Sequence, residues 1–400
     1  MNIPFSPPDI SQAEVDEVCD ALRSGWITTG PKTKELEREV AKFCNTSCAA
    51  CLNSATAALE LGLFTLGIGQ GDEVITSAYT YTASASPAVH LGAHLKLVDI
   101  SKDSYEMDYD QLEGTITDNT KVVIPVDIGG KICDYEQIRE VLASKSLKPK
   151  AGTLQEVFDH PIIFADAAHS FGAVKDGLPS GSHADFSSFS FHAVKNFTTA
   201  EGGALCWKEH EGLDSEEFYN KIMLYSLHGQ SKDALAKTQL GAWEYDIVLP
   251  AYKCNMTDIH AAIGLAQMKR YAGMLLRRKE IIEQYNHAFS DKDKFSYLEH
   301  FGKNFASSGH LYLLSLKGFS REKRDDFIIK MAQRGVATNV HYKPLPLMSA
   351  YKKLGFRIED FPNALARFES EVTLPLYSTL SDEQVQYVIE SVHKSYEELQ

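Results

Sequence analysis

Lys195 follows a short apolar and aromatic segment, residues 186–191, and precedes a stretch of small residues, 198–203. A lysine amine at such a junction between a predicted strand and a loop can form a Schiff base with a carbonyl compound. A lysine beside a turn is more often an ordinary surface residue. Lys195 alone therefore indicates no particular chemistry, and its meaning depends on the residues at neighbouring strand ends.

Asp166 ends an apolar segment, residues 162–165, and is followed by Ala167, Ala168 and His169. The carboxyl ends of parallel strands are where α/β folds bind ligands. An aspartate there can also simply begin a turn. Pyridoxal phosphate, however, needs a lysine for its aldehyde and an acidic partner for its pyridinium nitrogen. Asp166 and Lys195 together therefore favour a pyridoxal phosphate site.

Two further segments fit the same cofactor. Residues 53–58 open a predicted helix with small hydroxylic residues, and the amides of a helix N-terminus bind anions. Ordinary capping by Asn53 or Ser54 is the commoner reason for such residues. Tyr79 and Tyr81 follow a predicted strand, where an aromatic ring can stack on a flat ligand, although aromatic residues are more often core.

Other cofactor motifs are absent from the sequence. The glycines of residues 67–71 lack the G-x-G-x-x-G spacing and join a helix to a strand, so a nicotinamide oxidoreductase is a distant alternative. Cys44, Cys48 and Cys51 have no second cysteine or histidine pair at zinc spacing, which favours structural thiols. The histidines are scattered. We expect no metal site.

Composition restricts the partners and the compartment. The 400 residues include 40 Lys+Arg and 54 Asp+Glu, a net charge of −14, which argues against a nucleic-acid or anionic-membrane surface. No apolar run approaches the ~20 residues of a membrane span, and no secretory signal is visible. Seven cysteines, an odd number, suit reduced thiols. We expect a cytoplasmic protein with neither nucleic acid nor membrane as partner.

Alternating helices and short apolar strands predict an α/β fold with a mainly parallel sheet. An N-terminal lead-in of about 50 residues contains helices at about 12–24 and 32–43, and a third helix covers 53–66. A long helical pattern, with a break, is predicted from 256 to about 289, and shorter helices at 321–333 and 381–399. We expect a large domain at 1–255 and a smaller α+β domain at 256–400. Strands are predicted at 73–76, 95–99, 122–126, 162–165, 188–191, 204–207 and 310–316.

Taken in chain order, these parts resemble the DegT/StrS family of sugar-nucleotide aminotransferases, which use pyridoxal phosphate and have the aspartate aminotransferase fold. Each sequence segment by itself is weak evidence for the family, but the order and number of the segments make the resemblance specific. The resemblance extends over nearly the whole chain and is carried by residues 24–31, 53–59, 71–75, 166–169, 189–196, 201–203, 252–258, 341–345 and 374–376.

The resemblance implies a role for each catalytic residue. Lys195 would bind the cofactor aldehyde, and Asp166 would pair with the pyridine nitrogen. His169 would lie near the phenolic oxygen, where many relatives have glutamine. Tyr81 would stack on the ring.

The resemblance also implies contacts with the cofactor phosphate and with the sugar. Asn255 would reach the phosphate from a second subunit, which implies a homodimer with active sites at the subunit interface. His341 is as readily a packed histidine, and Lys343 a solvated lysine. Ser226-Leu227-His228-Gly229 lacks the arginine often found before His-Gly in this family. The phosphate is assigned to Ala55, Thr56, Ser190 and Asn255, and the sugar to Thr28, Thr29, His228, His341 and Lys343.

Transamination is the expected reaction, because family members that act as dehydratases replace this lysine with histidine. By analogy the amino donor is L-glutamate. The acceptor is a dTDP- or UDP-linked keto-deoxyhexose, aminated at C4 rather than C3, for surface polysaccharide or glycan synthesis. A pyridoxal phosphate sugar dehydratase and a non-catalytic regulatory protein of the same fold are the alternatives.

Overall fold

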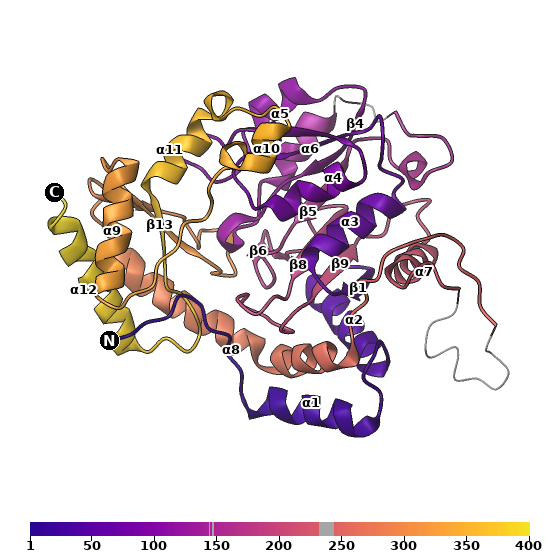
Figure 1. Cartoon of the computed structure of the whole chain (residues 1–400), viewed down its shortest axis with the longest axis horizontal. Coiled ribbons are helices and arrows are strands. Elements are labelled where there is room, and N and C mark those ends of the chain that lie inside the picture. The colour runs from indigo at the N-terminus through magenta and orange to yellow at the C-terminus, as the bar shows by residue number, and fades with distance from the viewer. Residues whose placement is uncertain (144, 146–147, 232–243) are drawn as a thin grey trace.

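A seven-stranded sheet, in the order β1-β9-β8-β5-β4-β2-β3, organises the larger part of the molecule (Figure 1). The computed structural model describes residues 1–143, 145, 148–231 and 244–400. Neighbouring strands pair in parallel except where β9 runs antiparallel to both β1 and β8. This confirms the prediction of an α/β fold with a mainly parallel sheet. The strands are β1 (Cys48–Leu52), β2 (Glu73–Ser77), β3 (His94–Val98), β4 (Thr120–Ile124), β5 (Ile162–Asp166), β8 (Phe186–Ser190) and β9 (Gly203–Trp207).

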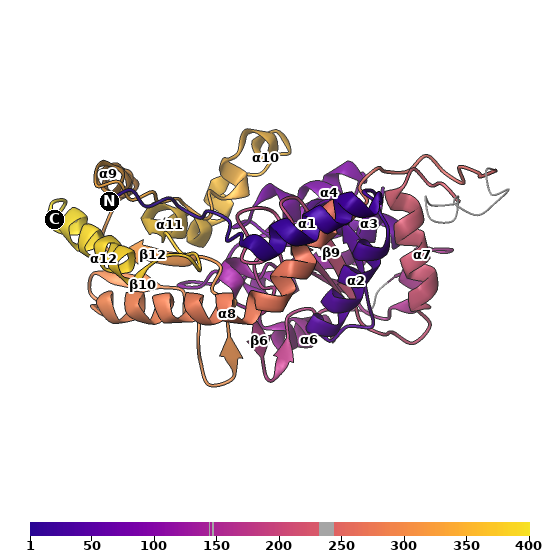
Figure 2. The same cartoon turned by 90° about the horizontal axis from the view of Figure 1, so that it is seen from below.

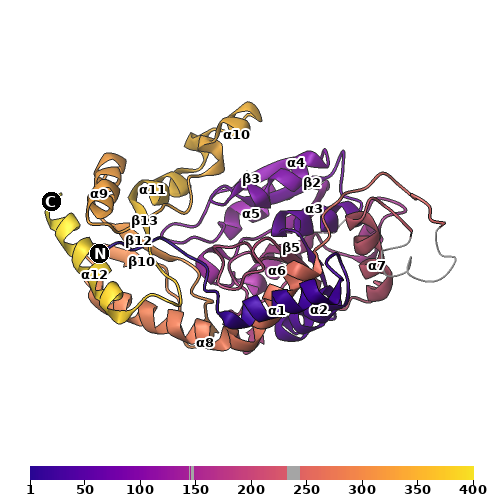
Figure 3. The ribbon, with the colours of Figure 1, turned by 60° about the horizontal axis from the view of Figure 1, so that its bottom comes forward.

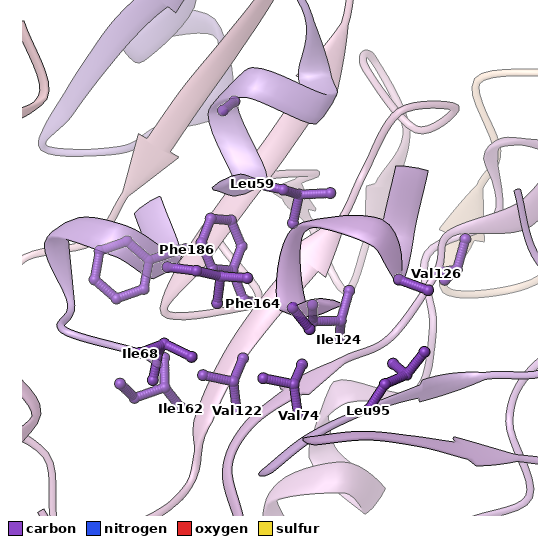
Figure 4. Close-up of a cluster of buried hydrophobic side chains, with 14 of the residues drawn as sticks. Leu59, Ile68, Val74, Leu95, Val122, Ile124, Val126, Ile162, Phe164 and Phe186 are labelled. Atoms are coloured by element: carbon purple, nitrogen blue, oxygen red, sulfur yellow. The ribbon is translucent and has the colours of Figure 1, made fainter. Parts of the chain in front are cut away.

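Both faces of this sheet are buried, which explains the near-continuous apolar strands. Figure 4 shows one face, where Val122, Ile162 and Phe164 pack in a cluster beside helix α3. A Cβ added to Gly62 of α3 would lie 2.5 Å from the Phe164 ring, so this glycine allows helix and sheet to approach closely. The covering helices are α2 (Pro31–Cys44), α3 (Ala55–Thr65), α4 (Ser86–His90), α5 (Tyr109–Thr115), α6 (Tyr135–Ala143) and α7 (Ser215–Ser226).

For two helices, the ends or breaks predicted from the sequence can be compared with the structure. α1 (Gln12–Ser24) begins with a capping box between Ser11 and Glu14 and ends at Gly25 with φ 77°, as predicted. α8 (Asp258–Ala288) is one helix of 31 residues, so the predicted break is wrong. The segment contains no proline, and its glycines weaken a helix by only about 1 kcal/mol each. Figure 2 shows α8 running along the molecule, from α1 and α2 toward α12.

A second, antiparallel sheet in the order β10-β12-β13 lies near the end of α8 (Figure 3). Ile3 packs in its core, and the Ile3 amide donates to the Gly335 carbonyl at 2.8 Å. The N-terminus therefore joins this sheet's core. The boundary predicted at residue 255 stays a prediction. The elements are β10 (Phe295–Tyr297), β12 (Tyr312–Leu316), α9 (Arg321–Gln333), α10 (Ser349–Lys353), α11 (Pro362–Ser370), β13 (Glu371–Leu374) and α12 (Asp382–Glu397).

The remaining short elements connect these parts. A small sheet joins β11 (Phe305–Ala306), β6 (Val174–Lys175) and β7 (Leu178–Pro179). Among the helices described, none is long and apolar enough to cross a membrane. The 3₁₀ turns are η1 (Thr82–Ser84), η2 (Ile128–Gly130), η3 (Leu154–Val157), η5 (Leu345–Leu347) and η6 (Ile358–Asp360).

Candidate active site

A cavity of about 420 Å³ lies where β5 and β8 end. Segments from the whole chain reach it, from Phe5 to Tyr342. Parallel strands place the residues after their carboxyl ends side by side, which is why residues far apart in sequence meet here. The predicted residues that line this cavity are Ala55, Thr56, Tyr81, Asp166, His169, Ser190, Lys195 and His341.

Asp166, the last residue of β5, is a buried carboxyl with fixed oxygens. Ser84 donates to its Oδ2 at 2.5 Å, and the Ala168 amide to its Oδ1 at 3.2 Å. Thr80 Oγ1 lies 2.7 Å from Ser84 Oγ and continues the chain of hydroxyls. Burial raises the pKa of Asp166, and the two donors and the Lys195 cation oppose that rise. The result is an oriented acceptor for a proton on a ligand.

Lys195 is half-buried in the cavity wall, in a turn closed by its amide donating to the His192 carbonyl at 2.9 Å. Burial lowers the pKa of Lys195 to about 8 from 10.5, although the Asp166 charge acts in the opposite direction. At pH 7.5 about a quarter of such amines are neutral. A neutral amine is the nucleophilic form, so the site activates this lysine.

His169 is a neutral hydrogen-bond donor. The Gly129 amide donates to its Nδ1 at 3.2 Å, so the ring proton is on Nε2, which lies 3.0 Å from the Tyr342 hydroxyl. Burial, with the Lys195 cation, holds the pKa of His169 well below its usual value. Gly129 adopts φ 68°, a backbone angle that favours glycine, in the turn η2.

The start of α3 provides amides for an anion. Ser54 caps the helix by accepting from the Ala57 amide at 3.1 Å. The amides of Ala55 and Thr56 have no protein acceptor among the described residues, and both residues line the cavity. A Cβ on Gly203 would lie 2.4 Å from the Ala55 nitrogen, so only glycine lets β9 start this close to the helix. With Ser190 alongside, these groups suit a phosphate.

Other predicted residues lie elsewhere. Thr28, Thr29 and Asn255 line a separate cavity of about 860 Å³ beside α7. Asn255 donates through Nδ2 to Thr29 Oγ1 at 2.6 Å. His228 and Lys343 line neither cavity, and Lys343 is exposed. One chain therefore brings together the residues assigned to the reactive end of the cofactor, and leaves apart four of the five assigned to the sugar.

The cavity also contains residues that the sequence prediction missed. Tyr342 contacts His169, and the His310 ring lies 4.4 Å from the His169 ring. Phe5 stacks on His341 at 5.7 Å. Tyr342 lies between His341 and Lys343, two residues to which the resemblance assigns sugar contacts. The same segment, residues 341–345, could therefore have indicated Tyr342 as a site residue. Phe5 has no sequence signal, because its position depends on the fold of the N-terminal segment.

The three cysteines that are close in the sequence do not gather in one place. Cys44 and Cys51 are buried with Cys206 on the side of the sheet away from α3, whereas Cys48 packs against the core on the α3 side, and all four are free thiols. Burial raises the pKa of Cys44 and Cys51 well above the usual value. In the described ranges no group of three or more His, Cys, Asp or Glu side chains is arranged so that it could hold a metal ion.

Comparison with known proteins identifies the family. Residues 8–393 match the DegT/DnrJ/EryC1/StrS aminotransferase family. The uncharacterised protein MJ1066 of Methanocaldococcus jannaschii is 37% identical over 396 residues, which are 98% of this chain and 97% of the relative. The spore coat polysaccharide biosynthesis protein SpsC of Bacillus subtilis is 36% identical over 98% of this chain and 96% of its own. The chain belongs to this aminotransferase family, which confirms the resemblance seen in the sequence.

Solved structures agree with this assignment. Spr1654 of Streptococcus pneumoniae, a candidate sugar aminotransferase, is 54% identical in its PMP form, with a TM-score of 0.97 and full coverage of both chains. Its PLP form is 51% identical with a TM-score of 0.96, again over the whole of both chains. The fold predicted from the resemblance is therefore confirmed.

Proposed function

We propose that this pyridoxal phosphate-dependent aminotransferase moves an amino group from L-glutamate to a nucleotide-linked keto sugar. The observation that carries the proposal is the meeting of Lys195, Asp166 and His169 in one cavity. Membership of an aminotransferase family supports it. So does Spr1654, whose structures include PLP and PMP forms.

The residues of the cavity fit this cofactor. The buried Asp166 carboxylate suits a protonated pyridine nitrogen, and His169 Nε2–H suits the phenolic oxygen. Tyr81 is 59% exposed, which leaves its ring free to stack on a ligand in the cavity it lines. The free amides of Ala55 and Thr56, with the Ser190 hydroxyl, suit the phosphate.

The chain's own groups then have distinct tasks. Pyridoxal phosphate supplies an aldehyde and an electron-withdrawing ring that stabilises negative charge on the donor carbon. Lys195 Nζ would take the proton from that carbon as a base and deliver it, as an acid, to the cofactor's former aldehyde carbon, a task for which its lowered pKa suits it. Asp166 holds the proton at the ring nitrogen. His169 donates to the phenolic oxygen and stays neutral.

The acceptor in this proposal is a dTDP- or UDP-linked keto-deoxyhexose, aminated at C4, for surface polysaccharide synthesis in the cytoplasm. SpsC, a spore coat polysaccharide biosynthesis protein, supports the polysaccharide part. His341 would contact the sugar from within the cavity. The remaining sugar contacts are assigned to Thr28, Thr29, His228 and Lys343.

A homodimer completes the proposed site. Thr28, Thr29 and Asn255 lie in another cavity of the same chain. A second subunit would therefore supply Asn255 to the phosphate, with Thr28 and Thr29 beside it.

The test is the visible spectrum of the purified protein after pyridoxal phosphate is added. A band that forms with the wild type and with Lys208→Ala, but not with Lys195→Ala, supports the cofactor and its lysine. Lys208→Ala is the matched control, because burial also lowers the pKa of this lysine and it does not line the cavity. A band of equal intensity with Lys195→Ala contradicts the proposal.

A further inference from the structure

Glu371 is a fully buried carboxyl that the proposed reaction does not use. It opens β13 and has no exposed surface. Its Oε2 accepts from the His341 amide at 2.9 Å, and its Oε1 lies 2.6 Å from Thr373 Oγ1. Thr373 Oγ1 in turn lies 2.8 Å from Nδ1 of the His341 ring. An unbroken chain of hydrogen bonds therefore runs from the buried carboxyl to a ring in the active-site cavity.

The cations nearest to Glu371 form no ion pair with it in the described structure. Arg324 of α9 donates to the carbonyls of Phe368 and Glu371 at 2.6 and 2.8 Å. Arg367 of α11 donates to Ser315 at 3.0 Å and covers the Tyr105 ring at 4.5 Å. Burial raises the pKa of Glu371 to about 8 despite both arginines and its two hydrogen bonds. The other titratable groups that face Glu371 are Tyr79, Tyr105, Tyr342 and His341.

The second ring nitrogen of His341, Nε2, is on a ring that lines the active-site cavity. Among the described residues no hydrogen bond reaches its Nε2, and the ring lines the cavity that holds Lys195. Burial and the Lys195 cation lower the pKa of His341 to about 3. A positively charged imidazole is therefore strongly disfavoured, and His341 by itself is a poor store for a proton.

We propose that Glu371, Thr373 and His341 form a proton relay, in which Nε2 of His341 takes up or releases a proton at the cavity while Glu371 stores it. With Glu371 ionised, Thr373 donates to Glu371 and His341 Nδ1–H donates to Thr373, so Nε2 is an acceptor. When a proton binds Nε2, the Nδ1 proton moves to Thr373, and the Thr373 proton moves to Glu371. The imidazole ends neutral, with its proton on Nε2.

The relay gives His341 two functions without a charge beside Lys195. Below the pKa of Glu371 the ring is a donor toward the cavity, and above it the ring is an acceptor. For the acceptor sugar, whose placement at His341 rests on the proposed function, this allows exchange of a proton with an oxygen or nitrogen of the substrate. Glu371 and Thr373 are positioning residues, since they act only through His341.

The experiment uses the full-length protein labelled with ¹⁵N-histidine, without cofactor or substrate, so that its result is independent of the proposed reaction. Long-range proton–nitrogen correlation spectra distinguish the two neutral tautomers from imidazolium. The His341 signals are those lost in His341→Gln. We expect the proton to move from Nε2 to Nδ1 as the pH rises through about 8. A single tautomer from pH 6 to 10, or an imidazolium signal in that range, would overturn the relay.

Two variants test whether the carboxyl drives this change. Glu371→Gln removes the ionisable group, and Thr373→Val breaks the chain while keeping the carboxyl, so each should abolish the pH-dependent change. Glu37→Gln is the matched control, because Glu37 is also buried with a raised pKa but bonds Tyr219 and the Cys51 amide. If Glu371→Gln does not fold, the tautomer measurement on Thr373→Val alone tests the relay. A tautomer change that persists in Thr373→Val contradicts the proposal.

Discussion

Two cavities of this chain differ in how complete they are. The cavity of Lys195 draws the acid, the amine and the donor from strand ends of one sheet and from the turns beside them. The cavity of Thr28, Thr29 and Asn255 is lined by the N-terminal loop and α7, with no residue of the first cavity. A sheet assembles the reactive groups within one chain. Thr28 and Thr29, assigned to the sugar, and Asn255, assigned to the phosphate, lie outside the first cavity, and we propose that a second subunit brings them to it.

The largest effect is expected at Lys195. Lys195→Ala removes the only lysine among the residues that line the first cavity, and with it the group proposed to move the proton from the donor carbon to the cofactor's former aldehyde carbon. Positioned acid–base groups contribute about 10²–10⁴-fold, and loss of the cofactor linkage adds to this. Transamination should fall below detection in a coupled assay, with an unchanged circular dichroism spectrum. Turnover within tenfold of wild type would contradict the role of Lys195.

Asp166→Ala should produce the next largest effect. It removes the carboxylate that holds the ring nitrogen protonated, and we expect a loss of about 10²-fold or more in kcat. Ser84→Ala keeps the carboxylate and removes one of its two donors, so it should cost about tenfold or less. Steady-state kinetics of the two variants provide the test. Equal losses would mean that the carboxylate charge is not what matters.

The difference between the cavities is tested by mixing subunits. As homodimers, Lys195→Ala should be inactive and Asn255→Ala weakly active. If Asn255 acts across the interface, each mixed dimer contains one intact site, and a random mixture recovers about a quarter of wild-type activity. No recovery after mixing and re-association would show that Asn255 serves its own chain, and that the two cavities are independent.

A smaller effect is expected in the pH dependence of the reactivity of the Lys195 amine. The pKa of Lys195 is lowered to about 8, so the reactive neutral amine appears above that pH, two units or more earlier than for an ordinary lysine. Acylation of Lys195 in the protein without cofactor, followed by peptide mass spectrometry, should rise with a midpoint near pH 8. Asp166→Ala removes the charge that opposes the shift, so the midpoint should move lower. A midpoint near 10 in the wild type would contradict the effect of burial.

The sequence was most informative where function depends on strand ends. Asp166 and Lys195 could be placed in one site because apolar strands are visible in the sequence and their carboxyl ends meet, whereas Ser190 was assigned from the family resemblance. Gly25 marked a helix end for a local reason, its left-handed backbone. These features depend on short-range pattern or on one general rule of parallel sheets.

The features that were missed depend on contacts between distant segments. The tautomer of His169 is fixed by Gly129, 40 residues away, and Tyr342 is 173 residues away. β1 was not predicted, because its small residues, Cys48–Leu52, gain strand structure only from pairing with β9. Ile3 was assigned to the lead-in of the larger part, yet it packs in the core of the smaller sheet.

The central claim, that the Lys195 cavity transfers amino groups, is tested most directly by a single half-reaction. The protein loaded with pyridoxal phosphate is mixed with excess L-glutamate, without a sugar, and the visible band and released 2-oxoglutarate are measured together. We predict that the band bleaches and that one 2-oxoglutarate appears per active site. A band that persists, with no 2-oxoglutarate released, would contradict amino transfer from glutamate at this site.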